Sequence, residues 1–320
     1  MYDCFMEKLV WQMFILGCEN LEEPLKKGLG GVIFFTKDIE SKEQFEKLIL
    51  DIKSKSLIPP FLSIDQEGGR VERTENIRPK RLSAKYAYDK GKDFLKTQSE
   101  EISEELSNFG INLNFAPCVD VNTNPLNPII GERAFANNPE DVIKGMEIFL
   151  NASRKFGVIP CVKHFPGHGD ADKDSHLTLP QIDLPLSEME NIHIKPFKHA
   201  INNNVEMIMI AHLHCTCFNN EIIPSSLSSN VIDYLRTQLK YDGVLISDDM
   251  VMKAVQDYGS LEAIIMGLQA GLDMFIFRNS DEKTLKTIEE LCKIIEKDPD
   301  LEKRVLESNK RISRLKEMYL

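Results

Sequence analysis

Eight short apolar runs, separated by amphipathic segments, constrain the fold of this 320-residue chain more than any other feature. Most of the runs are continuous rather than alternating in polarity, which is typical of parallel strands buried on both faces. They are residues 11–16, 31–35, 61–64, 111–116, 158–162, 207–211, 243–246 and 274–277. Eight strands that alternate with helices predict an α/β fold of the (β/α)8 TIM-type barrel class. Such a barrel typically takes about 250 residues, so we expect one domain over residues 1–320.

The segments between the runs carry helix signals. Three of them have apolar side chains at helical spacing: residues 41–54, 228–240 and 261–270. Asn138 followed by Pro139 indicates an N-cap with proline at the first helical position, and residues 187–190 fit a capping box. Residues 284–318 predict two helices broken near Pro299. The link between the first two runs is short for a helix, so we expect an irregular first β/α unit.

Charge and cysteine usage limit the partners. The net charge of −11 argues against a nucleic-acid surface and against binding to an anionic membrane. The apolar residues 9–18 are too few to span a bilayer and lack the basic flank of a signal peptide, so we interpret them as a first core strand. Seven cysteines without regular spacing favour a reducing compartment. We therefore expect a cytoplasmic protein with no membrane or nucleic-acid partner.

Polar side chains gather where the apolar runs end. They are Asp65, Asn114, Asp120, Lys163, His164, His212, Asp248, Asp249 and Arg278. Active sites of (β/α)8 barrels lie at the C-terminal ends of the strands. The pattern therefore predicts one charged pocket at that face.

The densest group of titratable side chains lies in residues 163–176, which hold three histidines and three aspartates. Pro166 and two glycines predict a loop here. In a loop, the spacing of Asp174 and His176 permits a direct hydrogen bond that fixes the imidazole tautomer, as general acid/base catalysis requires. The alternative is a pair that only holds the loop in place.

Asp248 and Asp65 each follow an apolar run. From its position, Asp248 is equally a candidate nucleophile, metal ligand or ion-pair partner. On an extended chain Asp248 and its neighbour Asp249 point to opposite faces, so one of them suits the site while the other suits a helix cap. Asp65 suits binding of two vicinal hydroxyls. An internally salt-bridged loop is the alternative for the charged residues that follow it: Glu67, Arg70 and Glu72.

Residues 212–217, His-Leu-His-Cys-Thr-Cys, contain four side chains of types that bind zinc. No second cluster with zinc-finger spacing accompanies them, and buried cysteine usually behaves as a small apolar residue. The role of this segment stays open, and we expect neither a metal nor another cofactor.

Together these motifs resemble the glycoside hydrolase family 3 β-N-acetylglucosaminidases over nearly the whole chain. The segments that carry the resemblance are residues 12–14, 31–35, 64–71, 114–117, 131–135, 163–176, 211–212 and 247–250. The most specific is Lys-His-Phe-Pro-Gly-His-Gly followed by Asp-Ser-His, because the β-glucosidases of the broader family lack the Asp-Ser-His loop.

The resemblance implies a monomeric retaining exo-glycosidase that removes terminal N-acetylglucosamine from peptidoglycan fragments. It implies that Asp248 is the nucleophile and that His176, oriented by Asp174, is the acid/base. The residues implied to hold the sugar are Asp65, Arg73, Arg133, Lys163 and His164. Residues 74–80 and 214–218 depart from the family pattern. The leaving-group preference therefore stays open. The choice between water and phosphate as acceptor also stays open, since a neutral histidine repels an anion less than a carboxylate does.

Two other classes of function are compatible with parts of the sequence. One is a metal-dependent hydrolase that uses the histidine-rich segments. The other is a sugar-binding module without turnover, which would retain Asp65, Lys163 and His164 as binding residues. The presence of Asp174, His176 and Asp248 favours the glycosidase over both.

Overall fold

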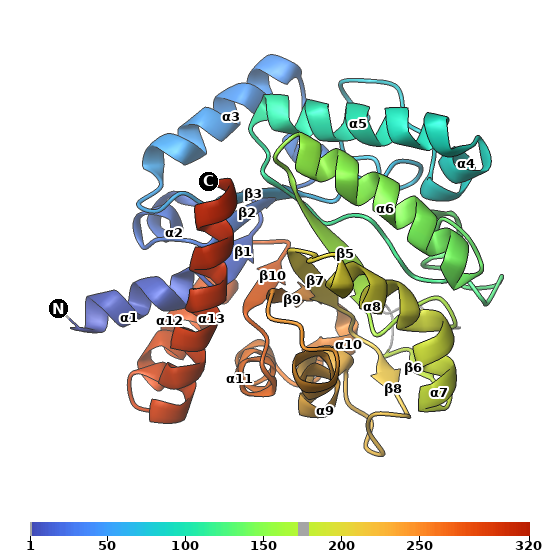
Figure 1. The fold of residues 1–320 in the computed structure, drawn as a ribbon. Helices are drawn as coiled ribbons and strands as arrows, with labels where there is room; N and C mark the ends of the chain where they lie inside the picture. Colours follow the sequence, from blue (N-terminus) through green and yellow to red (C-terminus); the bar gives the residue numbers. More distant parts are fainter. Residues whose placement is uncertain (1, 172–178) are drawn as a thin grey trace.

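The computed structural model describes residues 2–171 and 179–320. In these ranges, eight parallel strands close into a barrel in the order β1-β10-β9-β7-β5-β4-β3-β2 (Figure 1). The strands are β1 (Phe14–Leu16), β2 (Gly31–Phe34), β3 (Phe61–Ile64), β4 (Leu113–Asn114), β5 (Ile159–Phe165), β7 (Met207–Ile210), β9 (Val244–Asp249) and β10 (Met274–Phe277). Each of the eight apolar runs supplies one strand, so the predicted (β/α)8 fold is confirmed.

Helices surround the barrel. They are α1 (Tyr2–Trp11), α2 (Glu22–Lys26), α3 (Lys42–Lys55), α4 (Ala84–Asp89), α5 (Lys92–Phe109), α6 (Pro139–Lys155), α7 (Leu186–Glu188), α8 (Lys195–Asn202), α9 (Ser229–Asp233), α10 (Lys253–Gln256), α11 (Ser260–Ala270), α12 (Glu282–Ile295) and α13 (Pro299–Tyr319). The Asn138 side chain accepts a hydrogen bond from the backbone of Asp141, as its predicted N-cap role requires. The break before Pro299 and the short first unit, where α2 has five residues, are also confirmed.

Three local predictions were wrong. Trp11 ends helix α1 instead of beginning a strand, because α1 buries Met6, Val10 and Trp11 in the core and contacts α12 and α13. The predicted capping box fails because α7 begins at Leu186, so Ser187 lies inside the helix. The loop predicted to begin at residue 163 begins later, since β5 continues alongside β7 to Phe165 and ends with Lys163, His164 and Phe165.

A second, two-stranded sheet lies outside the barrel and was not predicted. It pairs β6 (Gln181–Ile182) with β8 (His214–Cys215) in parallel. Each strand has two residues, which is too short for a recognisable period-2 pattern.

The first and last helices meet on one side of the molecule. In Figure 1, α1 lies beside the C-terminal helices α12 and α13. Lys316 of α13 donates to the side chain of Gln12 and to the carbonyl of Pro59, which precede β1 and β3. The C-terminal helix therefore reaches the N-terminal end of the barrel, opposite the end where polar residues follow the strands.

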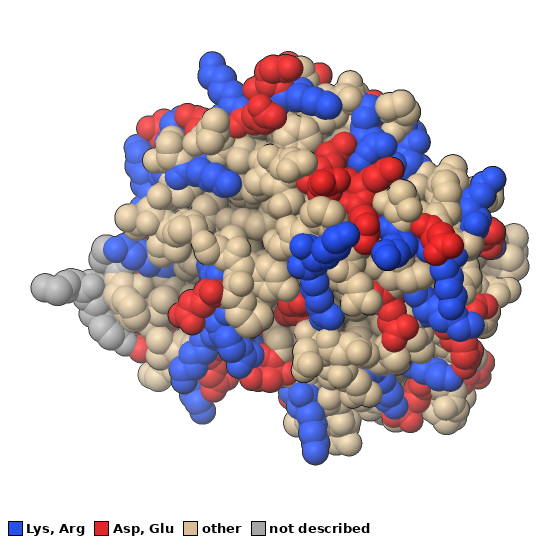
Figure 2. All heavy atoms as spheres, turned by 45° about the horizontal axis from the view of Figure 1, so that its top comes forward, with Lys and Arg blue, Asp and Glu red and all other residues tan. Residues whose placement is uncertain are grey.

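No described helix combines the length and the apolar character that crossing a bilayer requires. On the face drawn in Figure 2, basic and acidic side chains lie interspersed rather than separated by sign.

Candidate active site

A pocket of about 800 Å³ lies at the C-terminal ends of the strands. Its lining brings together six residues assigned to the site from the sequence: Asp65, Arg73, Arg133, Lys163, His164 and Asp248. The other two, Asp174 and His176, lie outside the described residues.

A buried cluster of charges forms one wall of the pocket. The Nζ atom of Lys163, on β5, lies 2.6 Å from an oxygen of Asp65 and 2.6 Å from Glu67 Oε1. Glu67 also accepts two hydrogen bonds from Arg133, at 2.9 Å from Nε and 2.8 Å from Nη2. Burial alone would raise the pKa of Glu67, but the Arg133 and Lys163 charges lower it well below the usual range. Glu67 therefore stays ionised and orients both cations.

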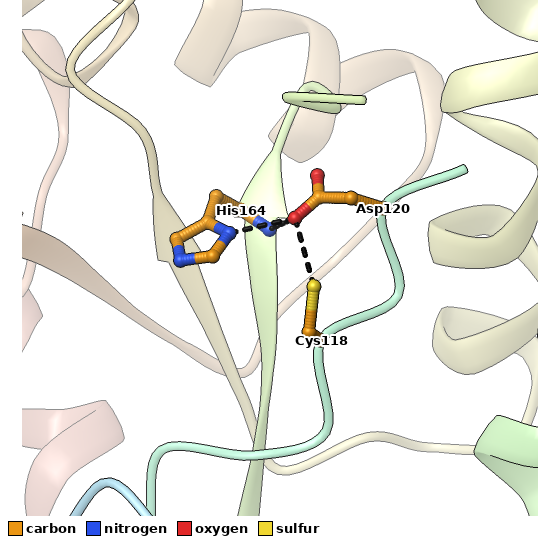
Figure 3. Close-up of side chains that lie close together, drawn as sticks. All are labelled: Cys118, Asp120 and His164. Atoms are coloured by element: carbon orange, nitrogen blue, oxygen red, sulfur yellow. Dashed lines mark hydrogen bonds and ion pairs between the residues drawn. The ribbon is translucent and has the colours of Figure 1, made fainter. Parts of the chain in front are cut away.

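His164 is oriented by Asp120, which follows β4 (Figure 3). The Nδ1 atom of His164 lies 2.6 Å from Asp120 Oδ2, and Nε2 lies 3.3 Å from Arg133 Nη2. Because a guanidinium only donates, Nε2 is the acceptor, which places the ring proton on Nδ1 facing Asp120. The imidazole is thereby fixed in one tautomer at the pocket wall.

Asp120 also completes the one group of three potential metal ligands found within residues 2–171 and 179–320, with Cys118 and His164. Thiol, carboxylate and imidazole are a donor set that suits zinc. However, Asp120 Oδ2 already accepts from the backbone and ring of His164 and from Cys118 Sγ, and Oδ1 accepts from the His168 backbone. The geometry is that of a hydrogen-bonded carboxylate that positions His164.

Asp248 and Asp249 end β9, and both line the pocket. One oxygen of Asp248 accepts from the Asp249 backbone at 2.7 Å. Burial would raise the pKa of Asp248, but the Asp249 backbone N–H and the positive charge of Lys163 are among the groups that lower it below the usual value, so the carboxylate is ionised at neutral pH. An ionised carboxylate at a pocket wall has the properties of a nucleophile.

Neither of the two aspartates caps the following helix α10, whose N-cap is Met252, so the predicted cap is absent. Asp249 instead pairs with an arginine. Its Oδ2 lies 3.0 Å from Arg278 Nε, and its Oδ1 accepts from the Val251 backbone. Burial raises the pKa of Asp249 to about 6. The two adjacent aspartates therefore differ in protonation behaviour.

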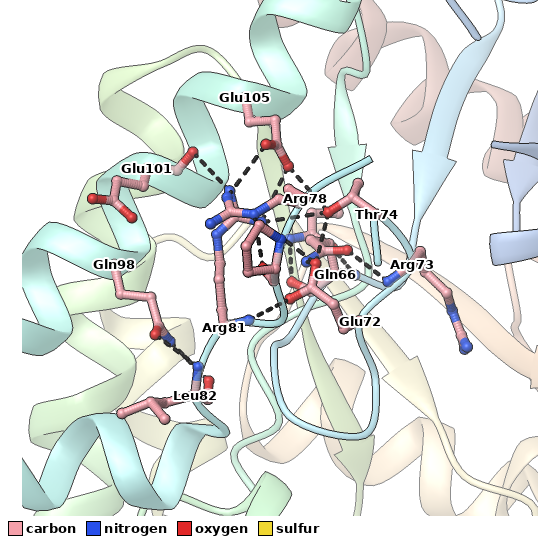
Figure 4. A network of polar contacts seen from close by, with 12 residues as sticks. Gln66, Glu72, Arg73, Thr74, Arg78, Arg81, Leu82, Gln98, Glu101 and Glu105 are labelled. Carbon is pink, nitrogen blue, oxygen red and sulfur yellow. Dashed lines mark hydrogen bonds and ion pairs between the residues drawn. The ribbon is translucent and has the colours of Figure 1, made fainter. Parts of the chain in front are cut away.

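Arg73 lies at the rim, with its guanidinium 5.5 Å from the Phe35 ring centre and Nη2 4.0 Å from Asp65 Oδ2. The Arg73 backbone donates to Gln66 Oε1 at 2.9 Å, and the Gln66 amide donates to Glu72 (Figure 4). These contacts fix the chain that carries Arg73.

Behind this turn, a buried arginine binds two carboxylates. Arg81 Nη1 lies 3.4 Å from Glu72 Oε1 and 3.1 Å from Glu105 Oε1 on α5. Glu72 thus forms the internal ion pair that the sequence left as an alternative. Glu67 instead bridges to β5 and Arg133, and Arg70 donates to backbone carbonyls of residues 128 and 129.

The side chains of residues 212–217 bond to separate partners. His212 Nδ1 lies 2.7 Å from Ser226 Oγ, and His214 Nδ1 lies 3.3 Å from the Ile223 carbonyl. The thiols of Cys215 and Cys217 contact each other, with Sγ atoms 3.3 Å apart. The four side chains do not converge on one centre.

Sequence reasoning assigned no site role to Glu67, Asp120 or His168. The sequence showed Asp120 as a polar residue after a strand, but it did not show that Asp120 pairs with His164 of β5. His168 lines the pocket, and burial lowers its pKa to about 4. In the described part of the chain, neither ring nitrogen of His168 has a hydrogen-bond partner.

Comparisons with known proteins identify the family of this chain. The glycosyl hydrolase family 3 N-terminal domain matches residues 12–315. A protein from Pseudoalteromonas piscicida named β-hexosaminidase A is 35% identical over 77% of this chain, and a β-hexosaminidase from Methylococcus capsulatus is 33% identical over 82%. The structure of a family 3 β-N-acetylglucosaminidase from a Paenibacillus species matches with a TM-score of 0.91 and 30% identity over 97% of this chain.

These relatives differ in length. The match spans 45% of the Pseudoalteromonas protein, 79% of the Methylococcus protein and 62% of the Paenibacillus chain. The family predicted from the sequence motifs is confirmed, and the chain belongs to glycosyl hydrolase family 3.

Proposed function

We propose that this chain is a retaining exo-β-N-acetylglucosaminidase. The observation that carries the proposal is the convergence of Asp248 with a buried cluster of charged side chains on one pocket, in a chain whose relatives are named β-hexosaminidases. Asp65, Lys163, Arg133, His164 and Arg73 hold the terminal sugar through its hydroxyl and acetamido groups. These side chains are kept in place by Glu67, Asp120 and Gln66.

In the proposed reaction, Asp248 attacks the anomeric carbon and forms a covalent glycosyl-enzyme, while His176 donates a proton to the leaving oxygen. His176 then takes a proton from the incoming water, and Asp174 keeps its imidazole in the required tautomer. Most retaining glycosidases use a second carboxylate for this role. The Asp174–His176 spacing in the sequence supports a histidine in its place.

The nucleophile is tested with a 2-fluoro or 5-fluoro aminosugar inactivator and peptide mapping. We expect the label on Asp248, and Asp248→Asn should lower kcat by roughly 10³-fold or more. The matched control is Asp51→Asn, which removes an exposed partner of Lys55 on α3 and should leave kcat unchanged. A label on Asp249, or on no carboxylate, contradicts the assignment.

The acid/base is tested with two leaving groups. His176→Ala should lose about 10²–10⁴-fold on substrates with poor leaving groups and much less on activated aryl glycosides, since only the former need a proton. Equal losses on both substrates would mean that His176 is structural.

We further propose that the substrates are peptidoglycan fragments with terminal N-acetylglucosamine, processed by a monomer in the cytoplasm. The six cysteines whose side chains are described are free thiols, which supports a reducing compartment. The test compares aryl β-N-acetylglucosaminide, aryl β-glucoside and a muropeptide, each with and without phosphate, and light scattering gives the oligomeric state. Preference for the glucoside contradicts the proposed sugar, and activity on the aryl aminosugar without activity on the muropeptide contradicts the proposed substrate.

A further inference from the structure

Two cysteine thiols lie in contact where β8 passes into a turn. Cys215 is buried and Cys217 is partly exposed, and their Sγ atoms are 3.3 Å apart. A disulfide bond is about 2.05 Å long, so the two sulfur atoms need to approach by only about 1.2 Å. The exposure of Cys217 gives a small oxidant access to one sulfur of the pair.

The two thiols differ in acidity. The pKa of Cys217 is lowered by its hydrogen bond with Cys215, although burial and the nearby Glu190 oppose the shift, while the pKa of Cys215 is raised. The thiolate is the reactive form of cysteine. Burial raises the pKa of each of the other described cysteines: Cys18, Cys118, Cys161 and Cys292. Reaction at neutral pH is therefore directed to Cys217.

We propose that Cys215 and Cys217 form a reversible redox site that peroxide converts into an intramolecular disulfide. The Cys217 thiolate attacks one peroxide oxygen, and the O–O bond breaks. Hydroxide is the leaving group, and Cys217 becomes a sulfenic acid. The Cys215 sulfur then attacks the Cys217 sulfur, the S–O bond breaks, and the Cys215 proton leaves with the hydroxyl group as water. In total, two thiols lose two electrons and two protons, and hydrogen peroxide becomes two water molecules.

The disulfide acts on the β6–β8 sheet through Thr216, the residue enclosed in its ring. The Thr216 backbone donates to the Ile182 carbonyl at 3.1 Å, and its hydroxyl donates to Asp183 Oδ1 at 2.7 Å. Closing so small a ring changes the backbone torsions at Thr216, which weakens these bonds to β6. A ring this constrained is also readily reopened by a thiol reductant. The site does not depend on the proposed sugar chemistry.

The test uses the full chain, reduced, freed of reductant and exposed to hydrogen peroxide before the remaining thiols are alkylated. Trypsin cleavage after Lys198 and Arg236 releases a peptide that contains Cys215, Cys217 and no other cysteine. We expect this peptide to carry no alkyl groups and to be lighter by two hydrogen atoms than its reduced form. Treatment with dithiothreitol should restore both thiols. Two alkylated thiols after peroxide, or a disulfide between two chains, overturns the proposal.

Two variants separate the pair from general thiol oxidation. In Cys215→Ser, the peptide should carry a sulfenic acid on Cys217 that dimedone captures. Cys18→Ser is the matched control, since Cys18 is also partly exposed but donates to the Ile33 carbonyl. In this variant the peptide that contains Cys215 and Cys217 should still form the disulfide. Loss of the disulfide in this control overturns the pairing. Hydrogen exchange at Thr216 should be faster after oxidation, and an unchanged rate overturns the effect on β6.

Discussion

Replacing Glu67 with glutamine tests how strongly the buried charge cluster stabilises the barrel. The Glu67 side chain is 4% exposed, and its partners Lys163 and Arg133 are 2% and 11% exposed. Glutamine keeps the size of the side chain but removes its charge. Lys163 retains Asp65 at 2.6 Å, whereas Arg133 loses the carboxylate that accepts two of its N–H groups.

The expected destabilisation follows from this burial. Removing one partner of a buried ion pair typically lowers the free energy of unfolding by about 3–5 kcal/mol. Because Lys163 keeps its pair with Asp65, we expect the loss in Glu67→Gln to be near the lower value. An unfolding entropy of about 2.1 cal/mol/K per residue gives roughly 0.7 kcal/mol/K for 320 residues. The melting temperature should therefore fall by roughly 4–5 °C.

The assay is thermal unfolding followed by circular dichroism at pH 7. Glu100→Gln is the matched control, because Glu100 pairs with the exposed Lys155 at 3.1 Å and such surface pairs contribute only roughly 0–1 kcal/mol. If Glu67→Gln melts within about 1 °C of the unmodified protein, the reasoning is refuted.

The same substitution has a defined pH dependence. The folded pKa of Glu67 is lowered, so the stability that Glu67 contributes is complete above the unfolded pKa of about 4.3 and is lost as pH falls through the folded pKa. The difference between the two proteins should therefore shrink as the solution is acidified below about pH 4.

Two further predictions concern other parts of the barrel. Burial lowers the pKa of Lys316 to about 7, so the unfolded chain binds more protons from about pH 7 to 10.4. Stability should rise over that range by up to about 1.4 kcal/mol per pH unit, and Lys316→Met should flatten the rise in urea denaturation at stepped pH. In Gly169→Ala, the added Cβ would lie 1.7 Å from the Val121 carbonyl oxygen. We expect a loss of about 1–3 kcal/mol or more, and an unchanged melting temperature would contradict it.

Local patterns in the sequence determined the barrel strands and several helix ends. The strand predicted at residues 61–64 is β3, and the one at residues 274–277 is β10, in both cases with the predicted bounds. Asn138 caps α6 as expected. These features depend on side chains close together in the chain, where apolar runs and capping hydrogen bonds leave a readable signal. The barrel class then placed the strand-end residues at one face.

Only the tertiary structure decided which of those residues are partners. Lys163 and Asp65 are 98 positions apart, and Arg133 and Glu67 are 66 apart. Sequence spacing carries no information about such pairs, because barrel closure brings them together. For the same reason the sequence left a local salt bridge open as an alternative for Glu67, whereas the fold pairs Glu67 with Arg133. The sequence also showed Cys215 and Cys217 only as candidate metal ligands, whereas the fold places their sulfur atoms against each other. Short-range periodicity encodes the elements, and long-range packing selects the contacts of the site.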